Sequence, residues 1–257
     1  MPWNKLNIFK SFLSLFVFSF CFLGIVGLQS QQYKKTVSTV GLDNYLQKEK
    51  EQQRLINLQK NLPSFGFDNL IADWTFMNFV QYFGDKPARD TIGYALVPDY
   101  FQAVSDRDPR FSKAYLTLSS ANSVYAGKPE QTVVLMERVL KSISPEKNED
   151  IAVLWSYKGM DELLFLGDTE AAKKSYERSA LFAQQQNSNL GNKLAIKNLQ
   201  TALFLSSAPD TKKAQIAAWS MVLPNIQDYR HRQEIIEKIN LLEQEMTDLK
   251  AEVVEEK

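Results

Sequence analysis

The sequence predicts an all-α protein in which a short solenoid of stacked helical hairpins lies between an N-terminal transmembrane helix and a C-terminal coiled-coil helix. Three observations predict this fold class: a self-similarity at an offset of 40 residues, an uncharged apolar run near the N-terminus, and a seam of regularly spaced apolar residues near the C-terminus. The chain has 257 residues, and 44% of them are hydrophobic, which is enough to build a core.

Residues 1–30 are predicted to contain a membrane anchor. Residues 11–28 carry no charged side chain, and as a helix they span about 27 Å, close to the hydrocarbon core of a bilayer. Lys5 and Lys10 precede this run, so the positive-inside rule places the N-terminus in the cytoplasm and the main domain on the periplasmic or lumenal side. A cleaved secretory signal is the alternative, whereas a lipoprotein signal at Cys21 is disfavoured because a bulky side chain precedes it.

Residues 31–62 are predicted to form a polar helical stalk. The stretch 42–62 contains no Gly or Pro, is rich in Gln, Lys and Glu, and is followed by Pro63, as expected for a solvated helix. Because its apolar stripe is thin, we expect it to hold the next domain away from the bilayer, with a partner-binding helix as the alternative.

Residues 63–224 are predicted to form the helical repeat domain. At an offset of 40 residues the chain matches itself in Tyr115 with Trp155, Gly127 with Gly167, Thr132 with Ala172, and Met136 with Tyr176. Each unit has an apolar helix, a turn at the glycine and a second, amphipathic helix, which is the plan of a hairpin that stacks on copies of itself. A third, more divergent unit ends at Pro224.

The first helix of this domain lies within residues 65–85, a stretch that is apolar on nearly every side. At helical length this composition predicts burial between neighbouring helices. A polar link over residues 85–93 follows, so the first unit is expected to be a hairpin with a lengthened turn.

The repeat resembles the tetratricopeptide class. The matching positions are Trp155 and Gly159 at the start of the first helix, Gly167 and Asp168 at the turn, Ala172 at the helix crossing and Tyr176 at the aromatic position. The period of 40 residues is longer than the usual length of about 34, and Ser179 replaces the second alanine of the family. The resemblance implies a tetratricopeptide-like fold and a scaffold that binds proteins.

A second resemblance is to a group of membrane-anchored repeat proteins found in bacteria, including cyanobacteria. It is carried by residues 70–74, 81–85 and 108–111. This likeness implies a thylakoid or related membrane, where the protein would assist the assembly or maintenance of a photosynthetic complex.

The side-chain inventory argues against an enzyme. His231 is the only histidine and Cys21 the only cysteine, so a metal cluster or a histidine-activated nucleophile has almost no residues to draw on. The glycines form no nucleotide-binding motif. Residues 229–232 are interpreted as a solvated helix start. We therefore expect no catalytic residue, no metal ion and no cofactor.

The balance between basic and acidic residues indicates which kind of partner to expect. Thirty basic residues equal thirty acidic ones, so no strong field attracts nucleic acid.

We expect protein partners instead, and three residues of the first repeat helix are candidates to bind them. Trp74, Asn78 and Gln81 are spaced 4 and 3 apart, so they share one helix face, and amide side chains pair with both groups of a peptide backbone. The alternative is that Asn78 and Gln81 satisfy each other or nearby backbone inside the stack.

Residues 225–257 are predicted to form a C-terminal coiled-coil helix. Its seam has alternating spacings of 4 and 3, and its members are Ile235, Ile239, Leu242, Met246, Leu249 and Val253. Acidic residues outnumber basic ones along its flanks, which favours a heteromeric coiled coil with a basic partner helix over a homodimer. The alternative is a single helix folded back on the repeats.

The sequence favours a non-enzymatic scaffold that is tethered to a membrane and binds a protein partner on the far side of that membrane. One alternative is a permanent accessory subunit of a membrane complex that docks through the C-terminal helix. An enzyme acting on cell-wall or peptide substrates is the other, and the shortage of histidines argues against it.

Overall fold

The structure is a computed structural model that describes residues 16, 18–20, 22–27, 29, 41–143 and 150–255, with side chains described as far as residue 248. These residues form helices and no strand, which confirms the predicted all-α class. The chain divides into two units, Met1–Tyr45 and Leu46–Lys257.

The predicted membrane anchor at residues 11–28 lies partly outside the described residues. Its described positions are helical and exposed. Among the residues that the structure describes, no helix is both long enough and apolar enough to cross a bilayer. The anchor therefore stays a prediction from sequence.

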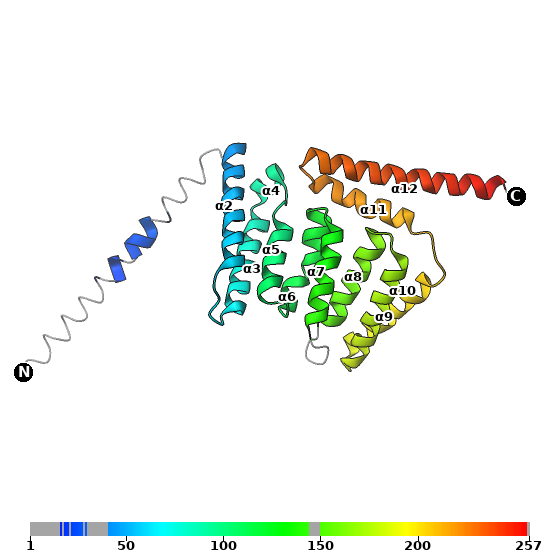
Figure 1. Cartoon of the computed structure of the whole chain (residues 1–257), viewed down its shortest axis with the longest axis horizontal. Helices are drawn as coiled ribbons and strands as arrows, with labels where there is room; N and C mark the ends of the chain where they lie inside the picture. The colour runs from blue at the N-terminus through cyan, green and yellow to red at the C-terminus, as the bar shows by residue number, and fades with distance from the viewer. Residues whose placement is uncertain are drawn as a thin grey trace, which may run out of the picture. The chain divides into compact units, whose positions relative to one another are not determined.

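From Leu42 onward, most of the helices run back and forth beside one another (Figure 1). In chain order they are α2 (Leu42–Asn61), α3 (Asp68–Gly84), α4 (Lys86–Ile92), α5 (Val97–Arg107), α6 (Ser112–Tyr115), the π-helix η1 (Ser119–Tyr125), α7 (Pro129–Ser142), α8 (Ile151–Leu164), α9 (Thr169–Gln185), α10 (Asn189–Leu205), α11 (Lys212–Val222), the 3₁₀-helix η3 (Leu223–Asn225) and α12 (Tyr229–Glu255).

One main core joins the helices from α2 to α8. α3 packs on α5, α5 on α7, and α7 on both η1 and α8. The largest side chains that this core buries completely include Tyr82, Phe101, Tyr115 and Met136. Each contributes about 2 to 3 kcal/mol of hydrophobic stabilisation, so the apolar faces of the amphipathic helices account for how they stack.

The helix crossing predicted at Ala172 is a close one. Ala172 is fully buried, and a Cβ built on Gly159 of α8 would lie 3.2 Å from the carbonyl oxygen of Ala172 in α9. The turns at Gly127 and Gly167 have φ angles of 67° and 68°, a conformation that glycine adopts without strain. The small residues and the two glycines thus have the local roles that the sequence predicts for them.

The first helix of the second predicted unit is interrupted. α6 ends at Tyr115, and the chain continues as the π-helix η1 instead of one continuous α-helix. In the hairpin of α8 and α9, Ser179 has a structural role of its own, because its hydroxyl donates to the carbonyl oxygen of Ala152 in α8 and accepts from Asn198 Nδ2 in α10. A serine at this position therefore connects three helices.

Helix α3 differs from the expectation of burial on every side. Its inner face, which includes Ala72, Thr75, Phe79 and Tyr82, is buried against α2 and α5. Its outer face remains exposed although it is also apolar. The reason is that α3 belongs to the first hairpin, and no helix in the described part of Leu46–Lys257 covers its other side.

Helix α2 also differs from the expected solvated stalk. It is helical as predicted, but Ile56 and Gln59 are buried in its C-terminal half. Arg107 of α5 binds the end of α2 through backbone carbonyl groups, including that of Leu62 at 2.6 Å. This half of α2 is therefore part of the folded domain, because one apolar side chain and one cation attach it there.

The C-terminal segment packs on the repeats through a second core. Phe165, Trp219, Val222, Ile226 and Ile235 are its main members. Helices α11 and α12 lie across the ends of the hairpin helices, with α11 in contact with α8 and η1 (Figure 1). At least the first part of α12 is therefore folded back on the domain.

Candidate partner-binding site

The exposed face of α3 carries a row of apolar side chains, which we call the α3 ridge. Its members are Phe67, Leu70, Trp74, Met77 and Val80. Leu70, Trp74 and Met77 are 64%, 51% and 56% exposed, and spacings of 4 and 3 place them on one side of the helix. Contiguous apolar surface of this kind is typical of protein-binding sites.

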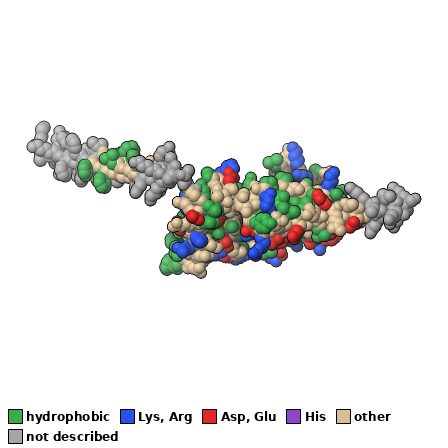
Figure 2. Space-filling view, turned by 90° about the horizontal axis from the view of Figure 1, so that it is seen from above, with side chains coloured by type: hydrophobic (Ala, Val, Ile, Leu, Met, Phe, Trp, Pro, Cys, Tyr) green, Lys and Arg blue, Asp and Glu red, His purple; other side chains and the backbone are tan. Residues whose placement is uncertain are grey.

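The ridge has no basic neighbour on its own helix. Between Asp68 and Gly84 the only charged residues are Asp68 and Asp73. Asp68 is engaged by its neighbours, since a hydrogen bond from Ser64 and the guanidinium of Arg107 lower its pKa. Elsewhere both signs of charge are mixed with hydrophobic side chains on the face that Figure 2 presents.

A small cavity opens between α2, α3 and α5 beside the ridge, and we call it the amide pocket. Its volume is about 150 Å³. Four of the six residues that line it carry carboxamide side chains: Gln52 and Gln59 from α2, and Asn78 and Gln81 from α3. Leu55 and Tyr100 complete the lining.

The amides of this pocket are not paired with one another. Gln59 is only 2% exposed, yet neither its Oε1 nor its Nε2 has a hydrogen-bond partner within the described residues. An unpaired buried polar group costs about 1 to 3 kcal/mol, so native proteins rarely leave one without a reason. The expected alternative, in which Asn78 and Gln81 bond to each other or to nearby backbone, is absent from the hydrogen bonds of residues 41–143 and 150–248.

The charged groups near the pocket are paired with other residues. The guanidinium of Arg89 lies 3.7 Å from the ring centroid of Tyr82 and 3.4 Å from Glu49 Oε1. The Tyr82 hydroxyl donates to Glu49 Oε1 at 3.1 Å and accepts from the backbone N–H of Leu96. These contacts tie α2 to α3 and α4, and they leave the pocket with a neutral lining.

Tyr100 lies at the buried end of the pocket. Burial raises the pKa of its hydroxyl to about 12, partly offset by the positive charge of Arg89. The phenol is therefore neutral at any physiological pH. The pocket can exchange hydrogen bonds but has no group in its lining to act as an acid or a base near pH 7.

The structure brings two of the three predicted residues of this site together. Asn78 and Gln81 line the amide pocket, whereas Trp74 lies next to it on the α3 ridge. The glutamines of α2 were missed because a helix rich in Gln, Glu and Lys was interpreted as solvated. The one available signal was Ile56, an apolar residue three positions before Gln59.

The predicted coiled-coil seam is partly covered within the chain itself. Ile235 is 3% exposed, and Ile239 and Leu242 are half-buried against the core that contains Trp219. These three side chains are therefore not free to dock a partner helix, because α11 already covers them. Met246 is half-buried, and the side chains of Leu249 and Val253 lie outside the described residues.

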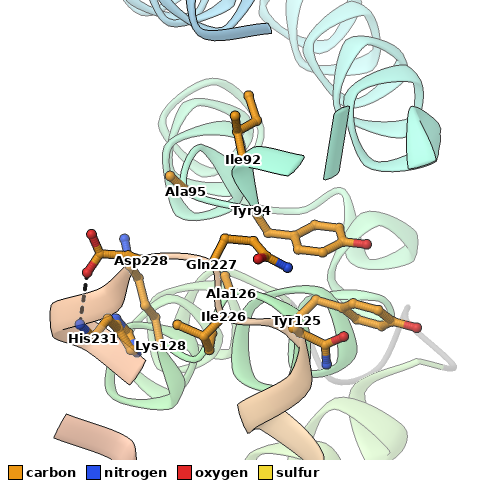
Figure 3. A pocket seen from close by; sticks show the side chains of 12 residues that line it. Ile92, Tyr94, Ala95, Tyr125, Ala126, Lys128, Ile226, Gln227, Asp228 and His231 are labelled. Carbon is orange, nitrogen blue, oxygen red and sulfur yellow. Dashed lines mark hydrogen bonds between the residues drawn. The ribbon is translucent and has the colours of Figure 1, made fainter. Parts of the chain in front are cut away.

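A larger cavity of about 300 Å³ opens where residues 92–95, 125–128 and 225–231 meet (Figure 3). His231 Nε2 lies 3.1 Å from the carbonyl oxygen of Gly127, and Asp228 Oδ1 accepts from the backbone N–H of His231 at 2.8 Å. These contacts fix the start of α12, which is less solvated than expected. We interpret this cavity as a packing gap where the start of α12 contacts the rest of the domain.

Another group of polar side chains is buried between η1, α7 and α8. Ser119 Oγ donates to Asp161 Oδ1 at 3.0 Å, and Ser123 Oγ donates to Thr132 Oγ1 at 2.8 Å. Burial raises the pKa of Asp161 to about 7; the serine hydroxyls oppose this rise and the charge of Glu162 adds to it. Because these groups are closed off from solvent, we interpret the cluster as structural.

The described residues contain no group of three or more His, Cys, Asp or Glu side chains that could hold a metal ion. No protein-family model matches the chain, and neither curated proteins nor solved structures include a match to it.

Proposed function

We propose that this protein is a non-enzymatic scaffold that binds a protein partner through the first helical hairpin. The observation that carries the proposal is the α3 ridge, which exposes Leu70, Trp74 and Met77 beside a pocket lined by four carboxamide side chains. Apolar side chains supply the affinity of protein interfaces, and neighbouring polar groups orient the partner. The lining of the amide pocket is neutral and holds no group that acts as an acid or a base near pH 7, which supports binding rather than catalysis.

The tether and the compartment belong to the same proposal. The uncharged run at residues 11–28 and the lysines before it support a single-pass anchor with the domain on the periplasmic or thylakoid-lumenal side. An anchored scaffold with an apolar docking helix suits the assembly or maintenance of a membrane complex, such as a photosynthetic one. The partner is then a subunit of that complex.

The proposal is tested by crosslinking and affinity purification of the tagged full-length protein. Met77→Asp places a charge in the middle of the α3 ridge and should reduce capture of the partner at least about tenfold. Met221→Asp is the matched control, because Met221 of α11 is also more than half exposed but lies away from the ridge. Equal capture by the two variants contradicts the proposal.

A second candidate function is a permanent accessory subunit that docks through α12. Helix α12 has 27 residues whereas α11, on which it packs, has 11, so much of α12 extends beyond that contact. Extraction with a mild detergent separates the two functions. A permanent subunit co-migrates with its complex in a fixed ratio, and an assembly factor does not.

A further inference from the structure

We infer that, when no partner is bound, the α3 ridge is covered by α10 of a second copy of this chain. The contact is head to tail, because α3 and α10 lie towards opposite ends of the row of helices. The inference rests on the proposed function, since it concerns what controls access to the same docking surface. It begins from α10, which exposes apolar side chains as α3 does.

Helix α10 is the last helix of the row that begins with the first hairpin. In this row α3 packs on α5, α5 on α7, α7 on α8, α8 on α9 and α9 on α10, so α3 and α10 lie far apart (Figure 1). Helix α11, which the repeat plan pairs with α10, packs instead on α8, η1 and α12. The outer side of α10 is therefore left without the helix that was expected to cover it.

The outer side of α10 carries four exposed apolar side chains, which we call the α10 face. Its members are Ile196, Leu199, Leu203 and Phe204. The end repeats of a solenoid normally present a polar outer side, because no neighbour covers it. Both ends of this row depart from that rule, and each exposes apolar surface of the kind that protein contacts cover.

The two ends carry charges of opposite sign. The only charged residues of α10 are Lys193 and Lys197, and both are exposed. The α3 ridge has the exposed Asp73 in its middle, three residues after Leu70 and four before Met77. Within residues 41–143 and 150–248, none of these three charges has an ion-pair partner. Each end therefore offers the charge that the other end lacks.

The same charges disfavour contacts between identical ends. A ridge packed on a second ridge would bring two Asp73 side chains together, and two α10 faces would bring their lysines together. Like charges that face each other in an interface are strongly unfavourable. Of the possible pairings of these two surfaces, only the one that joins α3 to α10 places opposite charges side by side.

The order of residues along the two helices favours a parallel arrangement. Val80 lies seven residues after Asp73 in α3, and Phe204 lies seven residues after Lys197 in α10. Seven residues make about two helical turns, so each apolar side chain lies on the same side of its helix as the charge. Parallel helices therefore match charge with charge and apolar with apolar side chains, whereas antiparallel helices place each charge on an apolar side chain.

Self-association of this kind regulates access to the ridge. The contact joins two different surfaces, so a dimer keeps one free ridge and one free α10 face, and further copies can add to it. A partner that binds the ridge competes with α10 for Trp74 and Met77. By mass action, a partner that binds more tightly separates the copies. The apolar ridge is thereby covered until the partner arrives.

The test is crosslinking of the full-length protein in the membranes of an expression host. Two differently tagged copies, both with Cys21→Ser to remove the native cysteine, carry Met77→Cys on the ridge and Gln200→Cys among the residues of the α10 face. A short bismaleimide should join the two different copies but not two copies with the same substitution. Met221→Cys on α11 replaces Gln200→Cys in the control and should give little product. Equal yields for the two pairs, or products between identical copies, overturn the inference.

Reversal of charge supplies the second arm. Asp73→Lys in both copies places like charges against Lys193 and Lys197, so it should lower the yield of the same crosslink at least about tenfold. Adding Lys193→Asp and Lys197→Asp to these chains brings opposite charges together again and should restore the yield. Such a recovery also shows that the variant is folded. An unchanged yield in Asp73→Lys, or a loss that the added substitutions do not reverse, contradicts the contact.

Failure of the proposed function has a different signature. Phe204→Asp should abolish the crosslink while it preserves or increases capture of the partner, because it frees the ridge without altering it. Capture that is sensitive to Met77→Asp in a protein that gives no crosslink overturns this inference alone. Crosslinking in a protein whose capture of the partner is insensitive to Met77→Asp overturns the proposed function, and with it the regulation inferred here.

Discussion

The guanidinium of Arg107 holds the backbone carbonyl oxygen of Gln59, which accepts from Nη2 at 2.7 Å and from Nε at 3.1 Å. The same Nη2 donates to the carbonyl oxygen of Lys60 at 2.8 Å, so one side chain of α5 satisfies the C-terminal end of α2. Together with the contacts of Glu49 with Tyr82 and Arg89, this contact holds α2 against the domain. It thereby positions the wall of the amide pocket to which Gln59 belongs.

Arg107→Lys should lower the free energy of unfolding by about 2 to 3 kcal/mol, because a single ammonium group cannot reach the carbonyl groups that the planar guanidinium joins. Urea denaturation followed by circular dichroism measures the change. Arg110→Lys is the control: the Arg110 side chain is 71% exposed and should contribute less than about 0.5 kcal/mol. Similar losses for both variants would show that Arg107 does not hold α2.

Ala172→Leu should destabilise the domain by about 1 to 3 kcal/mol, because Ala172 is fully buried at the close approach of α8 and α9. Lys174→Leu, two residues along the same helix on its exposed side, should change stability by less than about 0.5 kcal/mol. Thermal melting of the two variants checks the register of the hairpin, which is rejected if their losses are equal.

Asp161 should make the protein more stable in mild acid than in mild alkali. Its pKa is about 7 in the folded state and about 4 in the unfolded chain, so the folded state binds the proton more tightly. The stabilisation is present below pH 4 and is lost as the pH rises towards 7, by about 1 kcal/mol for each pH unit.

Asp161→Asn should remove this slope in denaturant melts recorded from pH 4 to 8, whereas Asp73→Asn on the exposed face of α3 should retain it. A slope that survives in Asp161→Asn would assign the pH dependence to another group.

Ile235→Asp should lower the stability of the domain by about 3 kcal/mol or more, because it places a charge in the core shared with Trp219. Leu241→Asp should cost less than about 1 kcal/mol, since Leu241 is 57% exposed on the same helix. Unchanged melting of Ile235→Asp would mean that α12 does not fold back on α11 in solution.

Local features of the chain could be predicted from sequence because they depend on neighbouring residues. Helical periodicity predicts the all-α class, and Gly127 and Gly167 mark turns because only glycine adopts their positive φ without strain. The common face of Asn78 and Gln81 follows from helix geometry alone. These predictions hold wherever the helices are placed.

Which face of each helix is covered was decided by the tertiary structure. The apolar residues of α3 surround the helix, so periodicity cannot show that Leu70, Trp74 and Met77 remain exposed while Phe79 and Tyr82 are buried. The 4 and 3 spacing of Ile235, Ile239 and Leu242 is equally suitable for a coiled coil and for packing on α11. Gln59 became part of a pocket because Arg107, 48 residues later, binds the end of its helix, and no local pattern contains that contact.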